Sequence, residues 1–212
     1  MIETVIFALT SFGVGLSGAL VPGPMLTVTI SDSVKKGFKA GPLVILGHFI
    51  TEFVIMIAIL AGLGYIIGSQ SAVFIIGTVG GLVLIFMGYN LSKQDKTLSE
   101  IKNEDYKSQK YGSVMGGIVT SISNPFFYIW WATVGCAFMF KGLELAGIIG
   151  LLGFIIGHWS ADFSWFTTVS FFSSRGSKIM NDKAYKSVMM ICGVFLVLLG
   201  AYFILSQIKV FF

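Results

Sequence analysis

The stretch from Leu20 to Met25 reads Leu-Val-Pro-Gly-Pro-Met and interrupts a long apolar run. A proline in a helix removes a backbone donor and clashes with the carbonyl four residues back, and glycine adds backbone freedom. The flanking residues 4–20 and 25–30 are apolar enough to lie in a lipid bilayer. Non-helical backbone at membrane depth is tolerated only where it is buried in protein or lines a water-filled cavity. We therefore predict a discontinuous transmembrane helix whose break lies near the membrane midplane, where transporters bind substrate.

The composition supports a membrane protein. Charged residues make up 11% of the 212 residues and hydrophobic residues 55%, whereas a soluble domain contains about 25% charged residues. The basic residues behind the net charge of +4 lie between apolar runs, which argues against a nucleic-acid partner. Cys136 and Cys192 lie inside apolar runs without CxxC spacing, so neither a redox pair nor a disulfide framework is indicated. We expect no cofactor and no enzymatic activity.

Six apolar segments are long enough to span a bilayer. They cover residues 4–31, 41–68, 72–92, 113–140, 144–172 and 186–208. The connections after the first, third and fifth segments carry 12 of the 14 lysine and arginine residues. Because basic loops remain on the cytoplasmic side, we expect a multi-pass protein of the plasma membrane with both termini outside the cell.

An internal repeat relates the two halves of the chain. The pattern Gly-His-aromatic-x-x-acid-Phe occurs at 47–53 in the second span and again at 157–163 in the fifth. A pair of glycines also recurs, as Gly81 and Gly88 in the third span and as Gly193 and Gly200 in the sixth. Three spans per unit force the second unit to enter the membrane from the opposite side. We thus predict a 3+3 inverted repeat, with residues 1–92 and 113–212 as the repeats and 93–112 as a cytoplasmic linker.

The fourth span contains a second break, at Asn124-Pro125. Asparagine is a preferred N-cap and proline suits the first helical position, so this pair predicts a helix start. Together with the break at Pro22, Gly23 and Pro24, it would aim two positive helix ends at one place, which suits the carboxylate of a substrate. A simple proline kink is the alternative interpretation.

Two acidic residues, Glu52 and Asp162, lie within apolar spans. Placing an acid at the centre of a membrane helix costs about 2.5 to 3.5 kcal/mol on insertion scales, and such residues usually bind ligands, relay protons or form pairs. His48 and His158 each precede one of these acids by four residues, so each pair shares a helix face. Histidine titrates near neutral pH and could pass a proton while the acid holds a cation. A structural ion pair and a buried hydrogen-bonded ring are the alternatives.

The glycine spacing resembles a family signature. After Pro24, Gly37, Gly41 and Gly47 follow at the spacing of the lysine exporter (LysE-type) family, whose first half reads G-x-x-x-G-P-G-P and then G-x-x-x-G-x-x-x-x-x-G-x-x-x-G. The chain departs from this signature at Ser17, Val21 and Thr51. The step at Asn124-Pro125 is similar to an N-P step in the second half of family members. The resemblance implies a proton-driven antiporter that exports amino acids or related small metabolites.

Three functions fit this architecture. In an amino acid exporter, the substrate carboxylate would bind at Pro24–Met25 and Asn124–Phe126, and its amine at Glu52 or Asp162, where protons would exchange. In a divalent metal transporter, the metal ligands would be His48, Glu52, His158 and Asp162, a mixed nitrogen and oxygen set. A membrane redox carrier would need cysteines beside the breaks, and the sequence has none there. The partners expected for the favoured exporter are an amino acid, protons and the lipid bilayer, with a homodimer left open beside the monomer.

Overall fold

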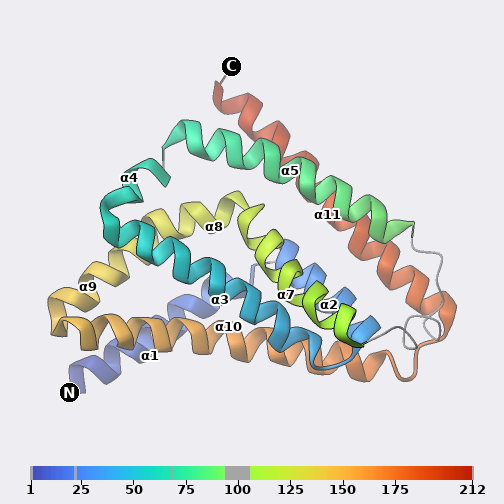
Figure 1. Cartoon of the computed structure of the whole chain (residues 1–212), viewed down its shortest axis with the longest axis horizontal. Helices are drawn as coiled ribbons and strands as arrows, with labels where there is room; N and C mark the ends of the chain where they lie inside the picture. Colours follow the sequence, from blue (N-terminus) through green and yellow to red (C-terminus); the bar gives the residue numbers. More distant parts are fainter. Residues whose placement is uncertain (1, 22, 68, 94–105, 212) are drawn as a thin grey trace.

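The computed structural model describes residues 2–21, 23–67, 69–93 and 106–211, and all regular structure in this part of the chain is helical (Figure 1). Six helices are long and apolar enough to cross a membrane. They are Ile2–Ala19, Ala40–Leu63, Gln70–Ser92, Pro125–Ala146, Ile148–Gly176 and Asp182–Gln207. The expectation of an all-α protein with six apolar helices is confirmed.

Two helices occupy the first predicted span. Helix α1 covers Ile2–Ala19 and helix α2 covers Pro24–Lys36. Pro24 takes the first helical position, where its missing N–H is not needed, and Gly23 is the N-cap residue with an extended backbone. Pro22, which the sequence places in the same break, lies outside the described residues.

The second span bends where the sequence predicted one uninterrupted segment. Helix α3 covers Ala40–Ala58, a π-helical segment follows at Ile59–Leu63, and the short helix α4 covers Gly64–Ile67. Gly62 has a φ of 87°, a left-handed conformation that favours glycine. Helix α5 then covers Gln70–Ser92, where residues 72–92 were expected.

The fourth span is longer than predicted. Helix α7 covers Tyr106–Ile122, α8 covers Pro125–Trp130, and α9 covers Cys136–Ala146, with a π-helical segment at Trp131–Gly135 between α8 and α9. The sequence placed the end of this span at residue 140. Helix α9 continues past that residue to Ala146, and its Lys141 and Glu144 are exposed and form an ion pair of 2.9 Å.

Two long helices complete the chain, α10 at Ile148–Gly176 and α11 at Asp182–Phe211. Helix α1 packs along α10, α3 along α7 and α5 along α11, and α2 contacts α3, α7, α10 and α11 (Figure 1). The largest buried cluster gathers around Trp131 and Phe154. A second cluster holds Met25, Val44 and Phe166 beside the start of α2.

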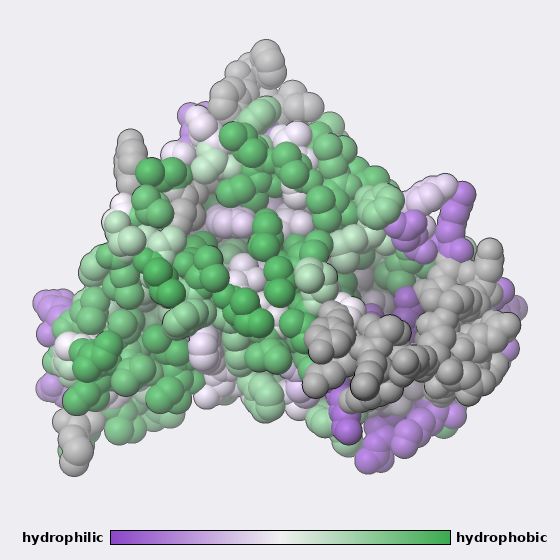
Figure 2. All heavy atoms as spheres, in the orientation of Figure 1, coloured by the Kyte–Doolittle hydropathy of each residue, from purple (hydrophilic) through white to green (hydrophobic). Residues whose placement is uncertain are grey.

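The exterior of the helices is apolar. Side chains such as Ile6, Val54, Phe86 and Phe172 are more than half exposed, and Figure 2 shows hydrophobic residues over most of the visible face. Hydrophilic residues gather on the right of this view, near the end that holds the connections at 37–39 and 177–181. An apolar surface of this extent suits contact with lipid.

Many polar contacts between helices lie near the end of the molecule that holds these connections, called the basic end below. The Asp32 carboxylate accepts from Lys36 and from the hydroxyl of Ser113 on α7, both at 2.7 Å. The Ser33 hydroxyl donates to Ser170 Oγ at 2.7 Å, and Ser170 in turn donates to the carbonyl of Phe38. These contacts tie α2 to α7 and α10.

Candidate functional site

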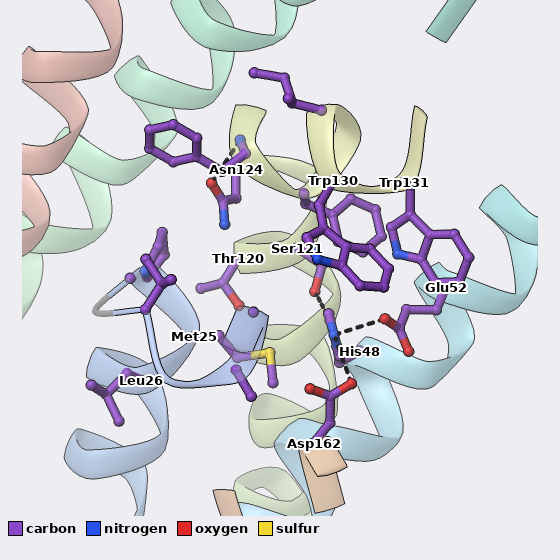
Figure 3. Close-up of a pocket in the computed structure, with 18 of the residues that line it drawn as sticks. Met25, Leu26, His48, Glu52, Thr120, Ser121, Asn124, Trp130, Trp131 and Asp162 are labelled. Carbon is purple, nitrogen blue, oxygen red and sulfur yellow. Dashed lines mark hydrogen bonds and ion pairs between the residues drawn. The ribbon is translucent and has the colours of Figure 1, made fainter. Parts of the chain in front are cut away.

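A cavity of about 500 Å³ lies where α1, α2, α3, α7, α8, α10 and α11 meet (Figure 3). Its size falls within the range of about 300 to 1,000 Å³ that is usual for small-molecule sites. Both chain breaks reach it, since Gly23, Pro24 and Asn124 are among its lining residues. The candidate site is therefore the place at which the two breaks converge.

The helix start predicted at Asn124-Pro125 is present. The Asn124 side chain accepts a hydrogen bond of 3.1 Å from the backbone N–H of Phe126, and Pro125 occupies the first helical position. Pro24 has the same position in α2, where Gly23 offers no side-chain cap. Two helix N-termini thus border one cavity, and N-termini carry the positive end of the helix dipole.

Both histidine–acid pairs meet in this cavity as one cluster of four side chains. The His158 Nε2–H donates to Glu52 Oε1 at 2.8 Å, and His48 Nε2 lies 3.2 Å from the same oxygen. Asp162 Oδ2 is farther away, at 3.4 Å from His158 Nε2 and 3.8 Å from His48 Nε2. Glu52, His158 and Asp162 are almost fully buried. The sequence predicted two histidine–acid pairs and, for the metal-transporter alternative, one site made of all four residues; the structure brings the four together around the Glu52 carboxylate.

The hydrogen bonds of Ser121 determine how His48 is protonated. Ser121 on α7 donates its hydroxyl to the carbonyl of Gly117 at 2.7 Å, so its oxygen accepts from His48 Nδ1–H at 2.7 Å (Figure 3). Among the described residues, the carboxylate oxygens of Glu52 and Asp162 lie 3.2 Å and 3.8 Å from His48 Nε2. A hydrogen bond there requires one further proton, carried by the imidazole or by an acid. The cluster therefore has a place for one shared proton.

His158 is in a different environment. Its ring stacks on Trp130 with centroids 4.7 Å apart, and on Phe154 at 5.7 Å. Its Nδ1 is buried and has no hydrogen-bond partner among the described residues. His158 is thus held between aromatic rings, whereas His48 is held by a hydroxyl group.

Some buried acceptors of the cluster remain available to a ligand. Glu52 Oε2 and Asp162 Oδ2 are buried without a hydrogen-bond partner in the described part of the chain. Ligand atoms of His48, Glu52 and Asp162 lie within 4.8 Å of one another, so this set could also hold a metal ion. Cationic groups in general, such as an ammonium or a metal ion, match this side of the cavity.

Sequence reasoning identified the acids, the histidines and the breaks, and it left out much of the lining. Leu199 and Phe203 come from α11, and Phe166 from α10. Leu199 and Phe203 lie in an apolar helix with no motif to mark them, and Phe166 lies just after the repeated motif, outside its pattern. Thr120 was also missed, although a polar residue shortly before the break was a usable signal.

Comparison with known proteins identifies the family. The model of the LysE type translocator family matches residues 16–207. One relative is the "Putative amino acid efflux protein YcgF" of Bacillus subtilis (strain 168), which is 25% identical over 199 residues that cover 92% of this chain and 93% of the relative. No solved structure matches the chain significantly. These findings do not favour metal transport. A translocator family and six apolar helices imply a multi-pass membrane protein, and the chain belongs to the LysE type translocator family.

Proposed function

We propose that this protein is a proton-coupled exporter of amino acids. One observation carries the proposal: a single cavity brings two helix N-termini against four titratable side chains. A zwitterionic amino acid needs a partner for its carboxylate and a partner for its ammonium, and this cavity offers both. The family and the efflux relative support the same substrate class.

The substrate carboxylate would bind at the helix starts. The helical run that begins at Pro125 continues to Ala146, and α2 begins at Pro24, so both present N–H groups and a positive dipole end. The ammonium group would bind the free carboxylate oxygens of Glu52 and Asp162. The proposed carboxylate site therefore consists of the residues predicted from the two breaks, which are Pro22, Gly23, Pro24, Asn124 and Pro125.

Proton coupling follows from competition within the cluster. The shared proton lies among His48 Nε2, Glu52 Oε1 and Asp162 Oδ2, the atoms that an incoming ammonium would also approach. A cluster that releases this proton can bind the ammonium, and a cluster that takes up the proton repels it. Each crossing then carries either the proton or the substrate, which is antiport. His158 would take part by donating to Glu52.

Contacts between helices support the inverted repeat. A Cβ on Gly47 would lie 2.0 Å from the carbonyl oxygen of Val114, and a Cβ on Gly157 would lie 2.2 Å from that of Ala8. Gly47 and Gly157 are the first residues of the two copies of the Gly-His motif. Their partners also correspond, since Ala8 precedes the first chain break and Val114 precedes the second. The same close approach thus occurs once between α3 and α7 and once between α10 and α1.

The α5–α11 pair contains a matching set of contacts. A Cβ on Gly81 would lie 2.6 Å from the Gly200 carbonyl oxygen, and a Cβ on Gly88 would lie 2.5 Å from that of Gly193. The repeat relates Gly81 to Gly193 and Gly88 to Gly200, so one contact maps onto the other. Discontinuous helices related by such a pseudo-two-fold axis are the arrangement that serves alternating access in transporters.

The exposure of the lining residues supports an outward-facing state. Val21, Phe126 and Ile129 lie on the side of the breaks away from the basic connections, and they are 57%, 48% and 41% exposed. Met25 and Thr120, on the side toward the basic connections, are buried. With the basic connections in the cytoplasm, the cavity of this state would be reached from outside, and the N-terminus would also lie outside.

Transport into reconstituted vesicles tests the proposal. Purified protein in liposomes should exchange amino acids, and an imposed pH gradient should drive net uptake. Glu52→Gln and Asp162→Asn retain shape and remove charge, so they should strongly reduce pH-driven uptake. Exchange of substrate for substrate moves no net proton and should survive in one of them. The exposed acid Glu144 on α9 gives the control, since Glu144→Gln should transport like the wild type.

Two results of this transport assay would contradict parts of the proposal. Vesicles that move none of the twenty amino acids would contradict the exporter. Uptake that is amino acid-specific and indifferent to the pH gradient would retain the exporter and contradict the proton coupling.

A further inference from the structure

We infer that the exported amino acid has a bulky, uncharged, apolar side chain. This inference rests on the proposed function and narrows its substrate class. The charged groups of the cavity come from α3 and α10, the helices that carry the His48–Glu52 and His158–Asp162 pairs. The remaining wall comes largely from α2, α8 and α11, and its apolar side chains include Met25, Leu26, Phe126, Ile129, Leu199 and Phe203. In Figure 3, Met25 and Leu26 lie on the α2 side of the cavity.

Packing fixes this apolar wall in place. Phe203 is 1% exposed and forms a core cluster with Leu84 and Leu196, against which Leu199 packs. The rings of Phe203 and Phe126 meet edge to face with centroids 5.5 Å apart. The wall therefore joins α8 and α11 and presents carbon atoms in a fixed arrangement.

Charge distribution excludes a second charge on the substrate. Among the described lining residues, the ionisable side chains are the two acids and the two histidines of the cluster. Once these hold the α-ammonium group, the ε-ammonium of lysine or the side-chain carboxylate of glutamate would find no second charged partner among the described lining residues. Burying an unpaired charge is far more costly than burying a hydrocarbon. An apolar side chain instead gains about fourfold in affinity for each buried methylene group.

Cavity size favours a large side chain. The cavity volume of about 500 Å³ leaves much of the apolar wall uncovered by alanine or serine. Leucine, methionine or phenylalanine would cover it. Leucine has three more side-chain carbons than alanine, so at about fourfold for each buried carbon it should bind at least tenfold better than alanine.

Competition in wild-type vesicles tests the inference without any variant. Radiolabelled leucine is loaded by counterflow, and unlabelled norleucine and lysine compete for it. These two share a four-carbon chain and differ by the terminal ammonium group. Norleucine should inhibit at a concentration at least 30-fold lower than lysine. Equal inhibition by lysine, or exchange restricted to alanine, serine or charged amino acids, would overturn the inference and leave the exporter intact. The absence of exchange for every amino acid would contradict the proposed function itself.

A variant pair tests the wall directly. Leu199→Glu places a carboxylate in the apolar wall, so lysine should inhibit at least tenfold better than it inhibits the wild type. Leu199→Gln adds polarity without charge and should not admit lysine. If Leu199→Glu fails to assemble in detergent, Phe203→Ala takes its place and should reduce the preference for phenylalanine over alanine by about tenfold. An unchanged preference in a folded Phe203→Ala protein would contradict the assignment of the wall.

Discussion

The Ser121 hydroxyl provides a sharp test of how the cluster holds its proton. Ser121→Ala removes the partner of His48 Nδ1 and leaves the rest of α7 unchanged. A buried donor without a partner costs about 1 to 3 kcal/mol. Because the His48 side chain is 12% exposed, water offsets part of this loss, and we expect about 1 to 2 kcal/mol. In a chain of this length, 1 kcal/mol corresponds to a change in Tm of about 2 to 4 °C. The Tm in detergent should therefore fall by about 2 to 8 °C.

Transport should change more specifically than stability. Without Ser121 to accept from Nδ1–H, the His48 ring can adopt the tautomer that carries its single proton on Nε2, so its contact with the carboxylates no longer requires the shared proton. A free-energy change of about 1 to 2 kcal/mol corresponds to a factor of about 5 to 30, which is the decrease expected in pH-driven uptake. Ser121→Thr retains a hydroxyl and should restore most of it.

The first repeat provides the control for this experiment. Ser11 on α1 is also buried, and its hydroxyl donates at 2.8 Å to the Phe7 carbonyl of its own helix. Ser11→Ala should leave the pH dependence of uptake unchanged. Equal effects of Ser11→Ala and Ser121→Ala, or wild-type uptake at every pH by a folded Ser121→Ala protein, would refute the reasoning.

Three further predictions concern packing and topology. Gly47→Ala should lower the Tm by about 2 °C or more, because the new Cβ meets a backbone carbonyl and overpacking costs about 1 to 3 kcal/mol; Gly13→Ala, with nothing within 4 Å, should not lower it. Lys36→Met should lower the Tm by a similar amount, because it removes the cation that pairs at 2.7 Å with the part-buried Asp32 carboxylate; an unchanged Tm would show that this ion pair adds no stability. In a cysteine-free background, Ile179→Cys should react with an impermeant reagent only from the cytoplasm and Ile148→Cys only from outside; the opposite pattern would reverse the topology.

The four-residue cluster was partly predictable from sequence. The repeated Gly-His motif placed Glu52 and Asp162 on equivalent helix faces, and a helical spacing of four put each histidine beside its acid. The helix start was also predictable, because N-capping by Asn124 and the fixed backbone of Pro125 depend only on neighbouring residues in the chain. What could not be predicted was that Glu52 Oε1 would lie within 3.2 Å of the Nε2 atoms of both histidines, because this depends on how α3 and α10 pack.

Other features depended on contacts that periodicity does not encode. Ser121 precedes the second break without a motif to mark it, and its hydrogen bond to His48 links two helices whose pairing was unknown. Leu199 and Phe203 lie in α11, an apolar helix without a marked face, so no residue pattern assigned them to the cavity. The bend at Gly62 was missed because a single glycine in a membrane helix is common.

The close approach of α5 and α11 has a mechanical consequence. At both crossing points a glycine lies so close to the other helix that an added Cβ would come within 2.6 Å of a backbone carbonyl oxygen. The two helices are therefore expected to move as one unit, which touches the remaining helices mainly through α2, α7 and α8. Leu199 and Phe203 belong to this α5–α11 unit, whereas Glu52 and Asp162 lie on α3 and α10, outside it. A bound amino acid would contact both parts, because its ammonium would bind Glu52 and Asp162 and its side chain would pack against α11. The length of that side chain would therefore set how strongly the substrate couples the α5–α11 pair to the other helices.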